Sequence, residues 1–378
     1  DENWNAYPNQ WKQLQTVKKL SKAFVEEQIK VWNQNSTLNF FAGDLSGDAE
    51  TSEKDGEKDS SKPWEKKEKR FDTADVNGVL EITKANQIFV DRTNVKPRMQ
   101  NQLRRLAAYS NPQFYKNQAM GFSVRGTPRI ISCSSDIDQY ICLPRGCEET
   151  LVHMAEQSGI SYTIQDCSQS GRAIHVNFQG ELYPEQKHAA EKMLAHDNGV
   201  LHAATAFGKT AVGAYLVAER KVNTLVLVHN TEIMKNWVED FEKFLLINEE
   251  LPQYTTPKGR TKTRKSVIGR LNSSHNSVTG IIDIVMISSL GKKGDINDLV
   301  KNYGMVIMDE CHHSASQTAE EVLNEVNAKY VYGLTATPKR DDGQEKRIFM
   351  QFGAVRYQYT SKDRAQKQGI GHFVYPRF

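Results

Sequence analysis

Short apolar runs alternate with longer amphipathic segments through the C-terminal half of this 378-residue chain. The runs are typical of buried strands, and the segments between them carry apolar residues at the spacing of one helix face. This alternation predicts an α/β fold in which helices flank a parallel, doubly wound sheet, with a ligand site at the carboxyl ends of the strands. The predicted strands lie within 200–201, 225–230, 283–290, 304–308 and 330–334, and the predicted core faces of helices include Ile233, Trp237, Phe241, Leu245, Ala319, Val322, Leu323 and Val326.

The N-terminal half follows other patterns. Apolar residues at helical spacing between Trp11 and Trp32 predict one or two helices, and residues 44–70 are so rich in Asp, Glu, Lys, Ser and Gly that they predict a flexible linker. Shorter strands (79–82, 88–90, 129–133, 162–164) and helices (100–106, 148–158) predict a small α/β domain. The expected organisation is a helical segment (1–43), a charged linker (44–72), an accessory α/β domain (73–179) and a larger α/β domain (180–378).

Composition restricts the class of protein. The chain has 49 Lys and Arg against 46 Asp and Glu, so its net charge of +3 requires any nucleic-acid surface to be local. It has no apolar run long enough to cross a bilayer and no signal peptide, which predicts a cytoplasmic protein without a membrane partner. Its five cysteines include no Cys-x-x-Cys pair, as expected in a reducing compartment. Cys142, Cys147 and His153 suggest a metal site, but we favour buried thiols.

A loop between a predicted strand and a predicted helix carries the first candidate chemistry. Residues 202–210 read His-Ala-Ala-Thr-Ala-Phe-Gly-Lys-Thr. Such a loop presents backbone N–H groups at a helix N-terminus, where the helix dipole favours phosphate oxygens. Lys209 would reach the β- and γ-phosphates of a nucleoside triphosphate, and Thr210 would bind Mg²⁺. The predicted nucleotide contacts are Thr205, Ala206, Phe207, Gly208, Lys209 and Thr210.

Two adjacent carboxylates end another predicted buried strand. Asp309 and Glu310 follow 304–308, a position where carboxylates are costly unless they bind something. Asp309 would bind the metal, and Glu310 would activate the water that attacks the γ-phosphate. With Lys209, these two residues are the predicted catalytic set. A third strand, 330–334, ends in Thr335-Ala336-Thr337-Pro338, which places two hydroxyls where a γ-phosphate sensor should lie.

Together these segments resemble motifs I, II and III of superfamily 2 helicases, in the DExH branch near XPB and UvsW. The resemblance rests on Gly208-Lys209-Thr210, Asp309-Glu310-Cys311-His312 and 335–338. It implies a RecA-like lobe, ATP and Mg²⁺ as cofactors, and ATP-dependent helicase or translocase activity on duplex or single-stranded DNA. It also implies that Gln186, in Leu182-Tyr183-Pro184-Glu185-Gln186, reads the adenine, and that Thr335, Thr337 and His312 couple hydrolysis to the strand.

The resemblance extends to candidate nucleic-acid contacts. Segments 225–230 and 283–290 are similar to motifs Ia and Ib, which implies that His229, Asn230 and Ser288 contact the nucleic-acid backbone. Plain sheet is the alternative for both. A basic run between them predicts salt-dependent backbone contacts by Lys258, Arg260, Lys262, Arg264 and Lys265. In the accessory domain, Arg92, Lys96, Arg98, Arg104, Arg105, Lys116 and Arg125 are candidates for phosphate contacts, while we favour a core role for Tyr109, Phe114 and Tyr115 over base stacking.

Relatives in this class use a second RecA-like lobe with an arginine finger, for which 361–378 leave no room. We therefore expect a fragment of a longer enzyme, weak or inactive without that lobe. The N-terminal stretch is similar to segments that follow a primase domain in the bacterial conflict systems called TOTE, so an upstream primase and a role in phage defence are further expectations. Two alternatives stay open: a duplex-translocating ATPase subunit of a restriction system, and a nucleic-acid-binding module without turnover.

Overall fold

The computed structural model describes residues 71–255, 259–292, 295–296, 298–337, 343 and 345–367. The chain divides into two compact units, residues 1–46 and 47–378, and every described element belongs to the second. The helices predicted within 11–32 and the linker predicted at 44–70 lie outside the described residues, as do Lys258 and Pro338.

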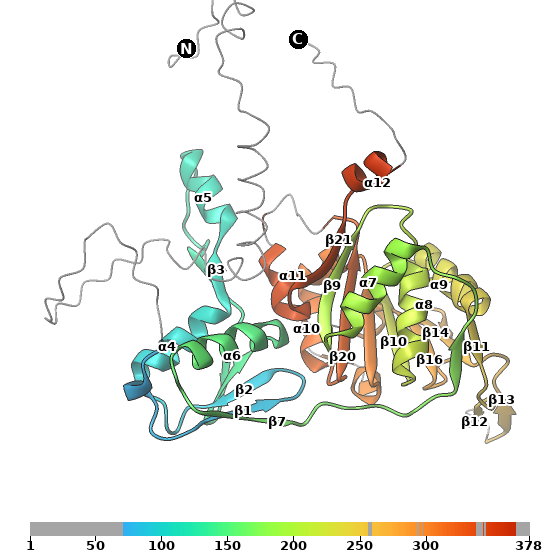
Figure 1. The fold of residues 1–378 in the computed structure, drawn as a ribbon, viewed down its shortest axis with the longest axis horizontal. Coiled ribbons are helices and arrows are strands. Elements are labelled where there is room, and N and C mark those ends of the chain that lie inside the picture. Colours follow the sequence, from blue (N-terminus) through green and yellow to red (C-terminus); the bar gives the residue numbers. More distant parts are fainter. Residues whose placement is uncertain are drawn as a thin grey trace, which may run out of the picture. The chain divides into compact units, whose positions relative to one another are not determined.

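An eight-stranded sheet forms the core of the larger domain (Figure 1). Its strands are all parallel except for the short edge strand β15, which runs antiparallel to β14. The predicted parallel sheet is confirmed, because every strand expected in this half is present. In spatial order the strands are β15 (His275–Asn276), β14 (Ile268–Asn272), β16 (Ile282–Met286), β10 (Thr224–Val228), β19 (Met305–Asp309), β20 (Tyr330–Thr335), β9 (Asn198–Ala203) and β21 (Val355–Tyr359).

Helices cover both faces of this sheet. The chain passes from β9 to β10 and on to β16 in one direction, and later from β19 to β20 and β21 in the other. Because crossovers between parallel strands are right-handed, helices formed in the two directions lie on opposite faces. One face carries α7 (Pro184–Leu194), α8 (Lys209–Arg220) and α9 (Thr231–Phe244), and the other carries α10 (Gln317–Glu325) and α11 (Glu345–Phe352) (Figure 1). Trp237 and Phe241 of α9 are fully buried, as predicted.

The smaller domain is built on a second sheet, ordered β5-β6-β2-β1-β7, in which only the β1–β7 pair is parallel. Two helices pack against it, and a two-stranded ribbon with a short helix projects from it (Figure 1). The predicted elements of this region are confirmed to within a few residues. The elements of the smaller domain are β1 (Leu80–Lys84), β2 (Ile88–Asp91), α4 (Pro97–Leu106), β3 (Ala108–Ser110), α5 (Pro112–Ala119), β4 (Ile130–Ser132), β5 (Ser135–Ile137), β6 (Tyr140–Leu143), α6 (Glu148–Gln157) and β7 (Tyr162–Asp166). Of these, β3, α5, β5 and β6 were not predicted.

Buried polar contacts join the smaller domain to the larger one. Arg145 is almost fully buried and donates hydrogen bonds to the carbonyl oxygens of Ala328, Val326 and Ala85, at 2.6, 3.1 and 3.0 Å. Arg356 of β21 forms a bidentate ion pair with Glu149 of α6.

The remaining short strands pair in twos. β8 (Val176–Phe178), within the predicted accessory domain, pairs with β11 (Leu245–Ile247) of the larger one. The others are β12 (Gln253–Thr255) with β13 (Thr261–Thr263), and β17 (Gly291–Lys292) with β18 (Asp295–Ile296). A last helix, α12 (Ser361–Lys367), follows β21.

Candidate active site

The loop that leads from β9 into α8 has the backbone of a phosphate-binding loop. Ala206 and Gly208 both have left-handed conformations, with φ of 63° and 88°, and Gly208 is the N-cap of α8. A Cβ atom at Gly208 would lie 2.4 Å from Nε2 of Gln186, so only glycine fits there. The first turn of α8 therefore directs its N–H groups towards the carboxyl edge of the sheet, where Lys209 and Thr210 also lie.

Gln186 fixes this loop from one side. Its Nε2 donates to the carbonyl oxygen of Phe207 at 2.7 Å, and its Oε1 accepts from the N–H of Tyr183 at 2.9 Å. The side chain is 7% exposed. An amide NH₂ has two hydrogens, so one remains for a ligand. The structure thus assigns Gln186 a role in holding the loop, and its contact with adenine stays a prediction.

Residues that the sequence did not single out fix the loop from the other side. The N–H of Ala204 donates to the carbonyl oxygen of Tyr359 at 2.9 Å, and Nη1 of Arg364 donates to the carbonyl oxygen of Thr205 at 3.0 Å. The ring of Phe207 packs 5.0 Å from that of Tyr359. These contacts come from β21 and α12, more than 150 residues further along the chain, so no local sequence pattern indicates them.

Lys209 of the phosphate-binding loop and Glu310 of the second motif, both predicted to be catalytic, lie next to each other. Nζ of Lys209 lies 3.2 Å from Oε1 of Glu310, and the two side chains are 13% and 24% exposed. Glu310 itself has a left-handed backbone, with φ of 47°, at the end of β19. Burial alone would raise the pKa of Glu310, but the charge and hydrogen bond of Lys209 outweigh it and lower the pKa below its usual range. Glu310 is therefore a carboxylate at neutral pH.

Asp309 is the more deeply buried of the two carboxylates, with 8% exposure. Its Oδ2 accepts a hydrogen bond from Nε1 of Trp237 at 2.7 Å, and its Oδ1 accepts from the N–H of Glu310 at 2.9 Å. Burial raises the pKa of Asp309, and the neighbouring Glu310 adds to the rise. Sequence analysis placed Trp237 in the core but missed this contact, although a buried indole N–H ordinarily requires an acceptor.

The same helix α9 also reaches Thr210. Burial raises the pKa of Asp240, while a hydrogen bond with the side chain of Thr210 counteracts the rise. Trp237 and Asp240 are three residues apart and therefore share a face of α9. One helix thus positions both predicted metal ligands.

The predicted coupling residues lie on the far side of Glu310. Nδ1 of His312 is 3.1 Å from Oγ1 of Thr335 and 3.3 Å from Oε2 of Glu310. Thr335 is fully buried, and its Oγ1 also accepts from the N–H of Thr337, whose side chain is exposed. The structure therefore brings His312 into contact with Glu310, connects Thr335 to that carboxylate through His312, and links Thr337 to Thr335 through its backbone N–H.

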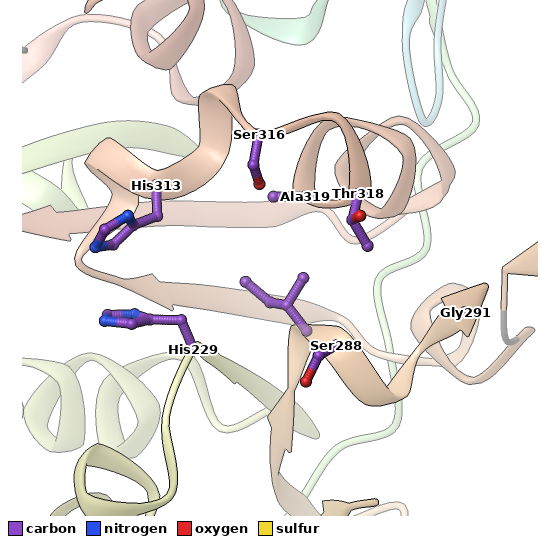
Figure 2. A pocket seen from close by; sticks show the side chains of 8 residues that line it. His229, Ser288, Gly291, His313, Ser316, Thr318 and Ala319 are labelled. Carbon is purple, nitrogen blue, oxygen red and sulfur yellow. The ribbon is translucent and has the colours of Figure 1, made fainter. Parts of the chain in front are cut away.

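A pocket of about 300 Å³ lies beyond these residues, lined by His229, Ile287, Ser288, Gly291, His313, Ser316, Thr318 and Ala319 (Figure 2). Two of the predicted nucleic-acid contacts, His229 and Ser288, come together here. The centroids of the His229 and His313 rings are 4.3 Å apart and those of His313 and His312 are 4.1 Å apart, with the rings tilted by 52° and 39°. Nδ1 of His229 is enclosed and has no hydrogen-bond partner among the described residues. A row of three adjacent imidazoles, called here the imidazole row, therefore connects the pocket to Glu310.

The other nucleic-acid candidates lie elsewhere. Oδ1 of Asn230 caps α9 by accepting from the N–H of Ile233 at 2.8 Å. The described members of the basic run do not line the pocket. Arg264 packs over the ring of Tyr254 at 4.1 Å, and Arg260, Lys262 and Lys265 are exposed on and beside β13.

In the smaller domain, several predicted phosphate contacts are engaged in ion pairs. Arg92 and Arg104 both pair with Asp136, at 3.2 and 2.7 Å, and Arg98 lies 3.7 Å from Asp75. Tyr109 is 4% exposed, which confirms its predicted role in the core. The same prediction is wrong for Tyr115, which is 37% exposed on α5, and Phe114 is only partly buried.

Cys142 and Cys147 are buried thiols, and burial raises the pKa of Cys147 to about 12. Within the described part of the chain, no cluster of three or more His, Cys, Asp or Glu side chains is arranged to hold a metal ion. No described helix is both long enough and apolar enough to cross a membrane.

Comparisons with known proteins agree with this geometry. Residues 179–340 match the family described as type III restriction enzyme, res subunit. A protein of Acanthamoeba polyphaga mimivirus named as an ATP-dependent RNA helicase is 26% identical over 205 residues, covering 52% of this chain and 34% of that protein. The "DNA 3'-5' helicase XPB" of Mycobacterium tuberculosis is 23% identical over 279 residues, covering 68% of this chain and 48% of that protein.

Among solved structures, the UvsW helicase from Bacteriophage T4 superposes with a TM-score of 0.52 at 14% identity, over 73% of this chain and 99% of that one. The chain spans from 28% to 51% of the length of these and other curated relatives. The family match, residues 179–340, includes all three motifs, and the structure shares the fold of UvsW over 73% of the chain. Residues 179–340 are therefore similar to the res subunit of type III restriction enzymes, and the chain resembles XPB helicases in sequence and the UvsW helicase in fold.

Proposed function

We propose that this chain binds ATP with Mg²⁺ at the carboxyl edge of the eight-stranded sheet and uses its hydrolysis to move along DNA. The observation that carries the proposal is the 3.2 Å contact between Lys209 and Glu310, because it brings the phosphate-binding loop and the carboxylate pair to one point across 101 residues of sequence. The names of the XPB relatives favour DNA as the substrate, and the mimivirus relative makes RNA the alternative.

The residues present fit a magnesium nucleotide. The left-handed Gly208 exposes the N–H groups of the first turn of α8 to phosphate oxygens, and Lys209 adds a cation beside them. Thr210 and the buried carboxylate of Asp309 would hold the metal, which would neutralise charge on the phosphate oxygens during transfer. Lys209 would leave Glu310 for those oxygens. Glu310 would then be free to accept a proton from the attacking water.

Coupling to the strand would run through the imidazole row, His229, His313 and His312. We expect His229, His313 and Ser288 to take a phosphodiester oxygen in the pocket, because all three carry polar atoms that line it. A shift of His313 would reach His312, which contacts both Glu310 and Thr335. In this proposal a second RecA-like lobe completes the site, as the resemblance implies.

The test is steady-state ATP hydrolysis and binding of a fluorescent ATP analogue, with and without single-stranded and duplex DNA. Lys209→Ala serves as the loss-of-site variant. We expect magnesium-dependent ATP binding that Lys209→Ala abolishes. Equal ATP binding by the wild-type chain and Lys209→Ala would refute the site.

A second candidate, a duplex-translocating ATPase of a restriction enzyme, is favoured by the description of the matching family. A strand-displacement assay separates the two. A helicase releases a labelled strand, whereas a duplex translocase displaces a bound protein block and leaves the strands paired.

A further inference from the structure

The two-stranded ribbon with its short helix, which projects from the smaller domain, exposes an unusual number of large apolar side chains. We call Ala108 to Ser132 the arm: it consists of β3, α5, the loop after α5 and β4, and stands out from the five-stranded sheet (Figure 1). α5 buries none of its residues. Of the ten large apolar side chains exposed in the described chain, four belong to the arm: Tyr115 (37%), Met120 (57%), Phe122 (64%) and Ile130 (50%).

The base of the arm is firmly held. Asn111 is 6% exposed, caps α5 through Gln113, and donates from Nδ2 to the carbonyl oxygen of Pro128 at 2.8 Å. The hydroxyl of Tyr109 accepts from Nε of Arg347 in α11 at 3.1 Å, which fixes the arm to the helicase domain. The exposed tip is thus presented by an ordered base.

The end of α5 directs Phe122 into solvent. The N–H of Phe122 donates to the carbonyl oxygen of Asn117, and the N–H of Gly121 donates to that of Gln118. With φ of 71° at Gly121, this is a Schellman motif. An apolar residue in the position of Phe122 usually packs on the residue in the position of Asn117. Because Asn117 is polar, Phe122 has no such partner in the motif, and packing does not explain why a large aromatic stands there.

The charge around the tip favours one class of partner. From Arg92 to Ser135 the sequence has no Asp or Glu. The cations on the arm itself, Lys116, Arg125 and Arg129, are exposed. Exposed aromatic and apolar side chains beside cations, without anions, are the features with which proteins bind unpaired nucleic acid, as bases stack on the rings and cations contact the backbone.

We propose that the arm binds single-stranded nucleic acid, with unpaired bases stacking on Phe122 and Met120 at its tip and with Lys116 and Arg125 contacting the backbone. This inference rests on the proposed function, since it gives the motor a second contact with the strand outside the pocket.

The test is fluorescence anisotropy with two single strands of equal length, an oligodeoxythymidine and an abasic strand that has the same phosphates without bases. The wild-type chain should bind the oligodeoxythymidine more tightly. The double variant Phe122→Ala/Met120→Ala should lose at least about fivefold in affinity for it and bind the abasic strand as before. Ile137→Ala removes a side chain of similar exposure, 51%, outside the arm and should change neither affinity.

Salt dependence tests the cations. Arg125→Gln should make the plot of log affinity against log salt concentration shallower by about 0.7, the value for one phosphate contact on a single strand. An unchanged slope would overturn the assignment of Arg125.

Two outcomes of the binding experiment would overturn the proposal for the arm and leave the proposed function intact. In one, the wild-type chain binds the two strands with equal affinity. In the other, the double variant binds oligodeoxythymidine as tightly as the wild type does. A double variant that converts an oligomer into a monomer in gel filtration would make the tip a contact between copies and overturn it as well. A wild-type chain that binds duplex DNA but neither single strand would overturn the proposal for the arm, whereas one that binds neither single strands nor duplex DNA would instead refute the proposed function from which the inference starts.

Discussion

The hydrogen bond from Trp237 to Asp309 provides the sharpest test of the site. Trp237→Phe keeps an aromatic ring in the core and removes only the indole N–H and part of the ring volume. Asp309 is 8% exposed, so water has little access to replace the lost donor. Burial already raises the pKa of Asp309, and the hydrogen bond from Trp237 is the largest influence that lowers it. The substitution should therefore raise this pKa further.

A hydrogen bond to a charged group contributes about 1.5 to 3 kcal/mol. At 1.4 kcal/mol per factor of ten, the loss corresponds to roughly a ten- to hundredfold weaker magnesium-dependent ATP affinity at a pH low enough to protonate Asp309 in both proteins. The sign of the pH dependence follows from the pKa. A carboxyl with a raised pKa is protonated over a wider acidic range, so the variant should regain affinity as pH rises. The acid limb of its affinity profile should lie at higher pH than that of the wild type.

The assay is titration of a fluorescent ATP analogue at saturating Mg²⁺ across pH. Phe241→Leu is the matched control, because Phe241 is also fully buried in α9 and packs edge-to-face on Trp237 at 5.1 Å. Both variants should lose some stability to unfolding, but only Trp237→Phe should move the acid limb. Equal displacement of the limb in both variants would show that packing, and not the hydrogen bond, sets the affinity.

Three further outcomes are expected. Glu310→Gln should lower ATP hydrolysis at least about a hundredfold and change the free energy of unfolding by less than about 1 kcal/mol, because the ion pair with Lys209 is partly solvated; a large loss of stability would contradict this. Arg145→Met should cost more than about 2 kcal/mol in urea unfolding, since two buried carbonyl oxygens and a partly buried one lose their donor, whereas Arg172→Met, whose side chain is 55% exposed, should cost little. Burial lowers the pKa of His202, so the unfolded chain binds more protons than the folded one and stability falls as pH drops below about 6.5; His202→Asn should flatten that slope in melting experiments.

The sequence was sufficient to predict the parallel sheet and the edge of the sheet at which the candidate site residues lie. Strand periodicity, together with the small and charged residues that end each strand, placed Lys209, Asp309 and Thr335 at one edge, and the structure confirms the edge. The rule that parallel strands share a carboxyl edge needs only the order of elements along the chain. This rule does not predict the rotamer of each side chain or the group that the side chain contacts. Asn230 illustrates this, because a polar residue after a strand serves equally well as a helix cap.

The contacts that were missed have a common physical form. Trp237, Arg145 and Arg364 each donate from a side chain to an acceptor far along the chain, and periodicity carries no information on such pairs. A buried donor must nevertheless be satisfied, so a tryptophan on an otherwise apolar helix face predicts that an acceptor exists, without identifying it. Once the sheet order is known, the choice narrows. Helix α9 follows β10, β10 pairs with β19, and the only carboxylate within β19 is its last residue, Asp309. Topology and hydrogen-bond satisfaction together therefore point to a contact that neither predicts alone.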